Sequence, residues 1–131
     1  MTEDFLDQVN WGADGLVPVI TQDHASKRLL TQAWLNREAL QTAVREGRAV
    51  YWSRSRQRLW RKGEQSGNVQ ELVDVYLDCD NDSVCFLVRQ LGGVACHTGR
   101  ESCYYQKLVE GSWQSVDPVL RDPDQMYGGQ S

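Results

Sequence analysis

Four cysteines lie within 25 residues of the chain, at positions 79, 85, 96 and 103, and His97 directly follows one of them. The N-terminal segment is acidic and has no basic and apolar secretory signal, so we expect reduced thiols rather than two disulfides. Three thiolates with a fourth position left to water are typical of catalytic zinc, whereas the C-x₂-C spacing of a zinc ribbon is absent. We expect Cys85 to lie in the core. His97 could be a metal ligand, a general base or a structural hydrogen-bonding residue.

Three aspartates, Asp78, Asp80 and Asp82, alternate with other residues. If the strand before them continues, their side chains project from one face and that of Cys79 from the other. Clustered carboxylates suit Mg²⁺ or Ca²⁺, but the spacing lacks the glycine and the final glutamate of an EF-hand. The run could also be an acidic turn without a cation. Repulsion between unpaired carboxylates favours the metal site.

Positive charge is concentrated in one segment, which contains Arg48, Arg54, Arg56, Arg58, Arg61 and Lys62 and no carboxylate. The complete chain has 14 basic and 18 acidic residues, so the rest of it is strongly acidic. A nucleic-acid-binding protein is usually basic over a whole face. The segment therefore favours a site for a small anion such as a phosphate ester. A solvated charged hairpin is the alternative interpretation.

The hydrophobic pattern predicts an α+β domain dominated by strands. Strands are expected at residues 16–22, 29–34, 71–78, 84–88 and 104–109, and a hairpin with a cationic tip at 49–60. The run 84–88 is apolar on both faces and so predicts a central strand. One helix is expected between an N-cap at Asn36 and Gly47, with a buried stripe of Ala39, Leu40, Ala43 and Val44.

The length of 131 residues is typical of one domain. We expect a lead-in at residues 1–15, a catalytic domain at 16–115 and a poorly ordered tail at 116–131. The longest apolar run has five residues, too few to span a bilayer. We therefore expect a cytoplasmic protein with no membrane partner.

Five motifs occur in order: Val-Tyr-Trp-Ser-Arg-Ser-Arg at 50–56, Leu-Trp-Arg-Lys-Gly-Glu at 59–64 with Ser-Gly-Asn at 66–68, Asp-Cys-Asp-Asn-Asp at 78–82, Gly-Gly-Val-Ala-Cys-His-Thr-Gly at 92–99, and Ser-Cys-Tyr at 102–104. Together with residues 16–23 and 33–40, they closely resemble phosphoribosyl-AMP cyclohydrolases of histidine biosynthesis. The resemblance runs from about residue 16 to residue 109. It departs mildly at 104–106, where Tyr-Tyr-Gln replaces the expected Phe-Tyr-Arg, and His24 falls in a variable turn.

The resemblance implies hydrolysis of the N1–C6 bond of the adenine ring in 1-(5-phosphoribosyl)-AMP. It implies a small mixed sheet or half-barrel with one principal helix, in an intertwined homodimer. One zinc per subunit is expected at the interface, with Cys79 of one chain joining Cys96 and Cys103 of the other. One Mg²⁺ per subunit is expected on the three aspartates.

The substrate's two 5′-phosphates would account for the basic segment. The residues expected to contact substrate are Trp52, Arg54, Arg56, Lys62, Ser66 and Gly67. Trp52 could stack on a base or be a core aromatic. His97 is the candidate for moving a proton between water and the ring nitrogen.

Two other classes of function compete with this hypothesis. A zinc-stabilised RNA-binding module would use the Trp/Arg hairpin, but it requires a broad basic face that the acidic remainder of the chain argues against. The other is a small interaction domain cross-linked by two disulfide bonds, which would bind no metal.

Overall fold

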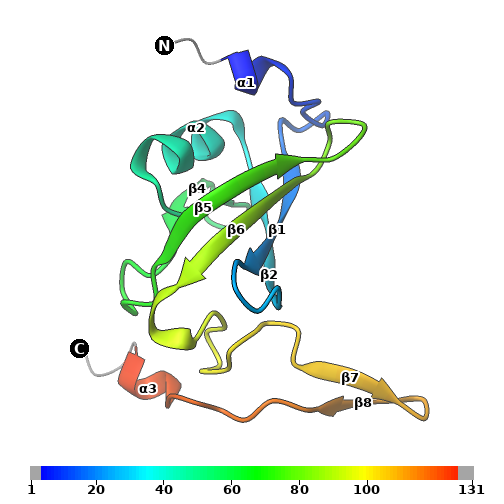
Figure 1. Ribbon diagram of the computed structural model, residues 1–131, viewed down its shortest axis with the longest axis vertical. Helices are drawn as coiled ribbons and strands as arrows, with labels where there is room; N and C mark the ends of the chain where they lie inside the picture. Colours follow the sequence, from blue (N-terminus) through cyan, green and yellow to red (C-terminus); the bar gives the residue numbers. More distant parts are fainter. Residues whose placement is uncertain (1–3, 127–131) are drawn as a thin grey trace.

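A four-stranded mixed sheet forms the centre of the computed structural model, which describes residues 4–126 (Figure 1). Its strands are β1 (Val17–Asp23), β2 (Leu29–Leu35), β5 (Gln70–Leu77) and β6 (Val84–Gln90), in the order β2-β1-β6-β5. Strand β6 pairs with β1 in parallel and with β5 in antiparallel fashion. The predicted α+β class and the central strand are confirmed. The sheet is open and does not close into a barrel.

Helix α2 (Arg37–Glu46) has both of the expected caps. The Asn36 side chain accepts a hydrogen bond from the Ala39 N–H at 2.8 Å, and Gly47 ends the helix in the left-handed conformation, at φ 71°. Its buried face contains Ala39, Leu40, Thr42 and Ala43. The expectation that Val44 belongs to this face is wrong, because its side chain is exposed.

The cationic segment forms the predicted hairpin, made of β3 (Val50–Ser53) and β4 (Arg58–Arg61). It packs with α2 against one face of the sheet, and the fully buried Tyr51 lies between hairpin and sheet. The Tyr51 hydroxyl lies 2.7 Å from Thr21 Oγ1 and donates to Gln70 Oε1 at 2.5 Å. Burial raises the pKa of Tyr51, so this phenol stays protonated. The hydroxyl thereby links the hairpin to two strands.

A bulge in β5 changes the side-chain alternation that the sequence predicts. The pairing with β6 shifts between Leu72 and Asp74, which leaves Val73 as the extra residue. Simple alternation along 71–78 would put Leu72 on the face opposite Val75 and Leu77, but with the bulge all three share one face. Because β5 is an edge strand, Val75 and Leu77 remain exposed.

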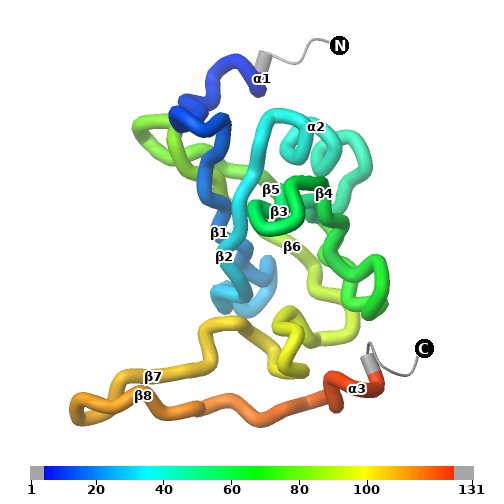
Figure 2. The backbone as a smooth tube through the Cα atoms, turned by 180° about the vertical axis from the view of Figure 1, so that it is seen from behind, coloured from blue at the N-terminus to red at the C-terminus, as the bar shows by residue number. Residues whose placement is uncertain are grey.

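After β6 the chain forms a short 3₁₀ helix, η1 (Leu91–Gly93), and an irregular loop. It then forms an arm of two paired strands, β7 (Gln106–Val109) and β8 (Ser112–Ser115). Figure 2 shows this arm extending away from the sheet. The expected strand at 104–109 is confirmed as β7, but β8 and the short helices α1 (Asp4–Asp7) and α3 (Pro123–Met126) were not predicted. No helix within residues 4–126 is both long and apolar enough to cross a membrane.

The expectation of a poorly ordered tail is wrong for residues 116–126. Within this segment the Leu120 N–H donates to the Gly99 carbonyl at 2.8 Å, and the Arg121 guanidinium donates to Asn68 Oδ1 at 3.2 Å. The carbonyl of Asp117 accepts from Arg100 Nε at 3.0 Å. The segment is therefore fastened to the loop that carries two of the cysteines. Residues 127–131 lie outside the described part of the chain.

Candidate metal and nucleotide site

Two of the candidate zinc ligands, Cys96 and Cys103, lie near each other in the loop after η1, where the Cys96 thiol acts on the pKa of Cys103. Backbone bonds fix both residues: the Cys96 N–H donates to the Arg100 carbonyl at 3.1 Å and the Cys103 N–H to the Leu30 carbonyl at 2.7 Å. Cys96 is buried and Cys103 is exposed. The loop thus holds a pair of soft ligands of which one is buried and the other reaches the surface.

The conformation of this loop depends on Gly99, which adopts φ 87°. A Cβ atom at this position would lie 1.8 Å from the carbonyl oxygen of Arg121. Only glycine permits both the left-handed backbone and the close approach of the C-terminal segment. The thiol loop and the segment 116–126 are therefore mutually dependent.

Lys62 lies beside the thiol pair, as a buried residue with 5% relative exposure. Its Nζ donates a hydrogen bond to the carbonyl of Ala95, the residue before Cys96. Desolvation lowers the pKa of Lys62, whereas the charges of Cys103 and Cys96 act to raise it. The charge of Lys62 acts to lower the pKa of Cys103, toward the thiolate form that binds zinc.

The pKa of Cys103 reflects this balance. Desolvation raises it, a hydrogen bond with Thr31 lowers it, and the adjacent Cys96 thiol raises it again. The charge of Lys62 acts in the lowering direction, but the net shift is upward. Two thiols so close together do not both ionise readily unless a cation binds between them.

The three aspartates form a cluster whose ligand oxygens all lie within 4.8 Å of one another. The expectation that these aspartates continue the strand is wrong. Strand β5 ends at Leu77, and a turn brings the carboxylates together, with Asp78 Oδ1 accepting from the backbone N–H of Asp82 at 3.0 Å and of Ser83 at 3.2 Å. Within residues 4–126 this is the only cluster of three or more histidine, cysteine or acidic side chains with metal-binding proximity.

Electrostatics at the cluster are typical of crowded carboxylates. Desolvation acts to raise the pKa of Asp78, but the two backbone hydrogen bonds outweigh it and the pKa lies below its ordinary value. The pKa of Asp82 is raised, first by its hydrogen bond with Asp80 and then by desolvation and the neighbouring negative charges. A divalent cation would relieve this repulsion, and an all-oxygen ligand set suits Mg²⁺.

Cys79 does not join the thiol pair within one chain. It is exposed in the aspartate turn after β5, whereas the Cys96–Cys103 loop lies near the start of that strand, at the other end of the sheet (Figure 1). The eight residues of β5 make that strand roughly 26 Å long at about 3.3 Å per residue. The three candidate zinc ligands are thus divided between two ends of the molecule.

The two remaining candidates of this region differ in their surroundings. His97 is exposed beside Cys96, and its ring makes no hydrogen bond with any residue between 4 and 126, so it is available to substrate or water. Cys85 lies within β6, where partial burial raises the pKa of its thiol. The expectation that Cys85 lies in the core is wrong, because its side chain is only half-buried and does not belong to the core cluster.

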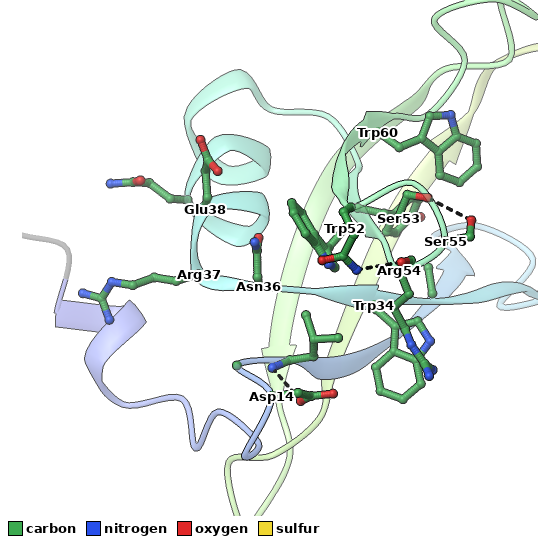
Figure 3. Close-up of a pocket in the computed structure, with 16 residues that line it drawn as sticks. Asp14, Trp34, Asn36, Arg37, Glu38, Trp52, Ser53, Arg54, Ser55 and Trp60 are labelled. Carbon is green, nitrogen blue, oxygen red and sulfur yellow. Dashed lines mark hydrogen bonds between the residues drawn. The ribbon is translucent and has the colours of Figure 1, made fainter.

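A cavity of about 1290 Å³ lies between the start of α2, strand β2 and the hairpin (Figure 3). Trp34, Trp52 and Trp60 supply aromatic surface, and Arg54 supplies positive charge. Trp52 also packs against the core, so both interpretations of this residue are compatible with its position. A second cavity of about 80 Å³ is lined by Arg56, Arg58, Trp60, Lys62, Gly63, Glu64, Gln65 and Ser66.

The expected contacts from Ser66 and Gly67 lie in the loop after the hairpin. Ser66 lines the small cavity, and its hydroxyl accepts a hydrogen bond from the Asn68 N–H at 3.2 Å. The Gly67 N–H donates to the Gly63 carbonyl at 2.9 Å. An anion contact from the Gly67 N–H would require this bond to break.

Sequence reasoning missed the two tryptophans that complete the cavities. Trp60 lies opposite Tyr51 in the hairpin and lines both cavities, and the Arg54 guanidinium lies 4.7 Å from the centroid of the Trp34 ring. The alternation within β4 could have placed Trp60 on the same face as Tyr51. The contact between Arg54 and Trp34 joins distant segments and left no such signal.

The family model for phosphoribosyl-AMP cyclohydrolase matches residues 31–105, which include α2, the hairpin, the aspartates and the thiol pair. The chain belongs to this family. Curated proteins of this name are similar over almost the whole chain. The protein from Azotobacter vinelandii is 58% identical over 125 residues, covering 95% of this chain and 94% of the relative.

Two other members of the family have comparable similarity. The protein from Pseudomonas aeruginosa strain LESB58 is 59% identical over 125 residues, covering 95% of this chain and 93% of the relative. The protein from Stutzerimonas stutzeri is 58% identical over 123 residues, covering 94% of each chain. The chain is therefore similar over almost its whole length to enzymes named phosphoribosyl-AMP cyclohydrolase, which confirms the resemblance seen in its motifs.

Proposed function

We propose that this chain hydrolyses the N1–C6 bond of the adenine ring in 1-(5-phosphoribosyl)-AMP, with zinc and Mg²⁺ bound in a homodimer. Membership of the family supports the reaction. The observation that carries the metal assignment is the pair formed by Cys96 and Cys103 beside the buried Lys62. This pair offers two soft ligands, and the exposed Cys103 lies where a ligand from a second chain could reach the metal.

The donor chemistry fits zinc. Thiolates are preferred zinc ligands, and three of them leave a fourth position for water. Cys96 and Cys103 would hold the metal together with Cys79 of a second chain. When bound, zinc lowers the pKa of water to about 7 and so supplies a hydroxide nucleophile at neutral pH.

The separation of Cys79 from the pair supports a homodimer. A closed three-thiolate site cannot form within one chain when roughly 26 Å of strand lies between its parts. The surface supports the same conclusion: Val75 and Leu77 are exposed along β5, and Leu108 and Trp113 are exposed opposite each other on the arm, at 56% and 67%. Two chains can cover such apolar surface in each other.

The substrate's reactive centre defines the tasks of the nearby side chains. Ribose attached at N1 makes the purine cationic and its C6 electrophilic. His97, exposed beside Cys96, would accept a proton from the attacking water and return it to the ring nitrogen as the N1–C6 bond breaks. Asp78, Asp80 and Asp82 would hold Mg²⁺. Trp52, Arg54, Arg56, Lys62 and Ser66 would bind the rest of the substrate.

Metal analysis combined with turnover tests this proposal. Protein purified without chelator should contain about one zinc per chain, have the mass of a dimer and open the ring of phosphoribosyl-AMP. Cys96→Ala should lose zinc and activity together while keeping its circular dichroism spectrum, whereas the control Cys85→Ala should keep both. A Cys96→Ala protein that retained zinc and turnover would contradict the assignment. A wild-type monomer without zinc would contradict the mechanism as a whole.

A further inference from the structure

The β3–β4 hairpin separates two cavities of different size and character. Arg54 lines the large cavity, and Arg56 and Arg58 line the small one. Trp60 lines both and is their common wall. The arginines of the hairpin are therefore distributed over two places and do not form a single cationic patch.

These three arginines are free to bind an anion, unlike the other cations of the segment. Within residues 4–126 no carboxylate pairs with Arg54, Arg56 or Arg58, and Arg54 is held only by the face of Trp34. By contrast, Arg61 pairs with Glu46 at 2.7 Å, and Arg48 donates to the Lys62 carbonyl at 3.0 Å. Glu64 also lines the small cavity and Asp14 and Glu38 the large one, but in the described part of the chain none of them pairs with these arginines. Unpaired cationic side chains at a cavity wall are suited to phosphate.

We propose that the hairpin divides the two 5′-phosphates of the substrate, so that Arg54 binds one in the large cavity and Arg58, with Arg56, binds the other in the small cavity. This inference rests on the proposed function. The large cavity, at about 1290 Å³, has room for a nucleoside and offers Trp34 and Trp52 to it. The small cavity, at about 80 Å³, has room for little more than a phosphate group.

The position of Lys62 decides which phosphate goes where. Lys62 lines the small cavity and hydrogen-bonds the carbonyl next to Cys96, so this cavity adjoins the thiol pair. The bond that breaks joins N1 to C6, and the phosphoribosyl group is attached to N1. The phosphate of this group therefore lies on the reacting side of the substrate and belongs in the small cavity, which adjoins the thiol pair. The phosphate of the AMP half belongs with Arg54. AMP alone should consequently depend on Arg54 and not on Arg58.

Calorimetric binding of AMP to the metal-loaded protein, combined with kcat/KM for phosphoribosyl-AMP, tests the division. Arg54→Gln should weaken AMP binding roughly ten- to hundredfold, because it removes a charge-assisted hydrogen bond. Arg58→Gln should leave AMP binding within about twofold but lower kcat/KM for the full substrate by a similar roughly ten- to hundredfold factor. In the double variant the two losses in kcat/KM should multiply, as they do for separate contacts. Arg89→Gln, which removes an exposed pair with Glu71 outside both cavities, is the matched control.

Two results would overturn the division. One is AMP binding that weakens equally in both single variants; the other is a double variant whose kcat/KM is no lower than that of the less active single variant. Either would mean that the arginines share one phosphate. If the wild-type protein does not turn over phosphoribosyl-AMP, the proposed function fails. In that case the intact substrate's own dissociation constant replaces kcat/KM in the same comparison, and the division is still tested.

Discussion

Complementation between two inactive variants tests whether each zinc site is assembled from two chains. Cys79→Ala removes the ligand in the aspartate turn, and Cys103→Ala removes one from the thiol pair. Each variant alone has a defect in both sites of its homodimer, so both homodimers should be inactive. In a mixed dimer, one site collects both defects and the other site is intact.

The expected recovery follows from this geometry. When equal amounts of the variants exchange subunits freely, about half of the dimers are mixed, and each of these holds one intact site of two. The mixture should therefore recover about a quarter of the wild-type rate per mole of chain. A zinc site contained in one chain predicts no recovery, because every chain in the mixture carries a defect.

The assay follows opening of the purine ring before and after the variants are mixed under mild denaturant to promote exchange. Subunit exchange is shown separately by native mass spectrometry, with one variant isotopically labelled. A mixture of Cys103→Ala with Cys96→Ala is the control, because both defects then lie in the same half-site and no dimer has an intact site. Proven exchange without recovery in the first mixture would refute the shared site.

Three further predictions concern the scaffold around the site; the first and third are measured by chemical denaturation and the second by zinc titration. Tyr51→Phe should lower the free energy of unfolding by about 2–3 kcal/mol, because it leaves two buried partners without their hydrogen bond, whereas Tyr76→Phe at an exposed position should change it by less than about 0.5 kcal/mol. Gly99→Ala should destabilise the thiol loop and reduce zinc affinity, since the new methyl group meets a backbone carbonyl; unchanged affinity would contradict this. Asp23→Ala should cost about 1 kcal/mol at neutral pH, because hydrogen bonds from Ser26 above all lower the pKa of this carboxyl. That contribution is complete above the unfolded-state pKa and disappears as the pH falls through the lower folded-state value, so a cost that stays constant into acid would contradict the assignment.

The local chemistry of the sequence predicts the elements near the site well. The caps at Asn36 and Gly47 define α2 because their backbone and side-chain requirements are local. The run 84–88 predicts a central strand because a strand covered on two sides needs apolar residues on both faces. Features that depend on pairing between segments are less visible. The bulge at Val73 depends on how β5 meets β6, and the order of residues 116–126 depends on contacts with Gly99.

The candidate site divides in the same way. Types and spacing single out the cysteines, the aspartates and the arginines, because each residue type has its own ligand chemistry. The sequence cannot show that a turn, instead of a strand, gathers the aspartates, since a single hydrogen-bonded Asp78 sets that turn. Neither can it show that Trp60 separates two cavities, which depends on the hairpin's position against the sheet.

The position of strand β5 explains why two chains would be needed to complete each zinc site. This strand carries Cys79 and the aspartates beyond one end, and it starts near the thiol pair of its own chain. In a two-fold symmetric pair, any contact made once is made twice. An arrangement that brings Cys79 of one chain to Cys96 and Cys103 of the other therefore builds two sites at once. Because Asp78 and Asp80 flank Cys79 in the sequence, the same arrangement also brings the carboxylate cluster beside His97 of the second chain. Zinc and Mg²⁺ would then lie in one shared active site, each held mainly by a different subunit. A correctly folded monomer could therefore not bring the two metal ions together.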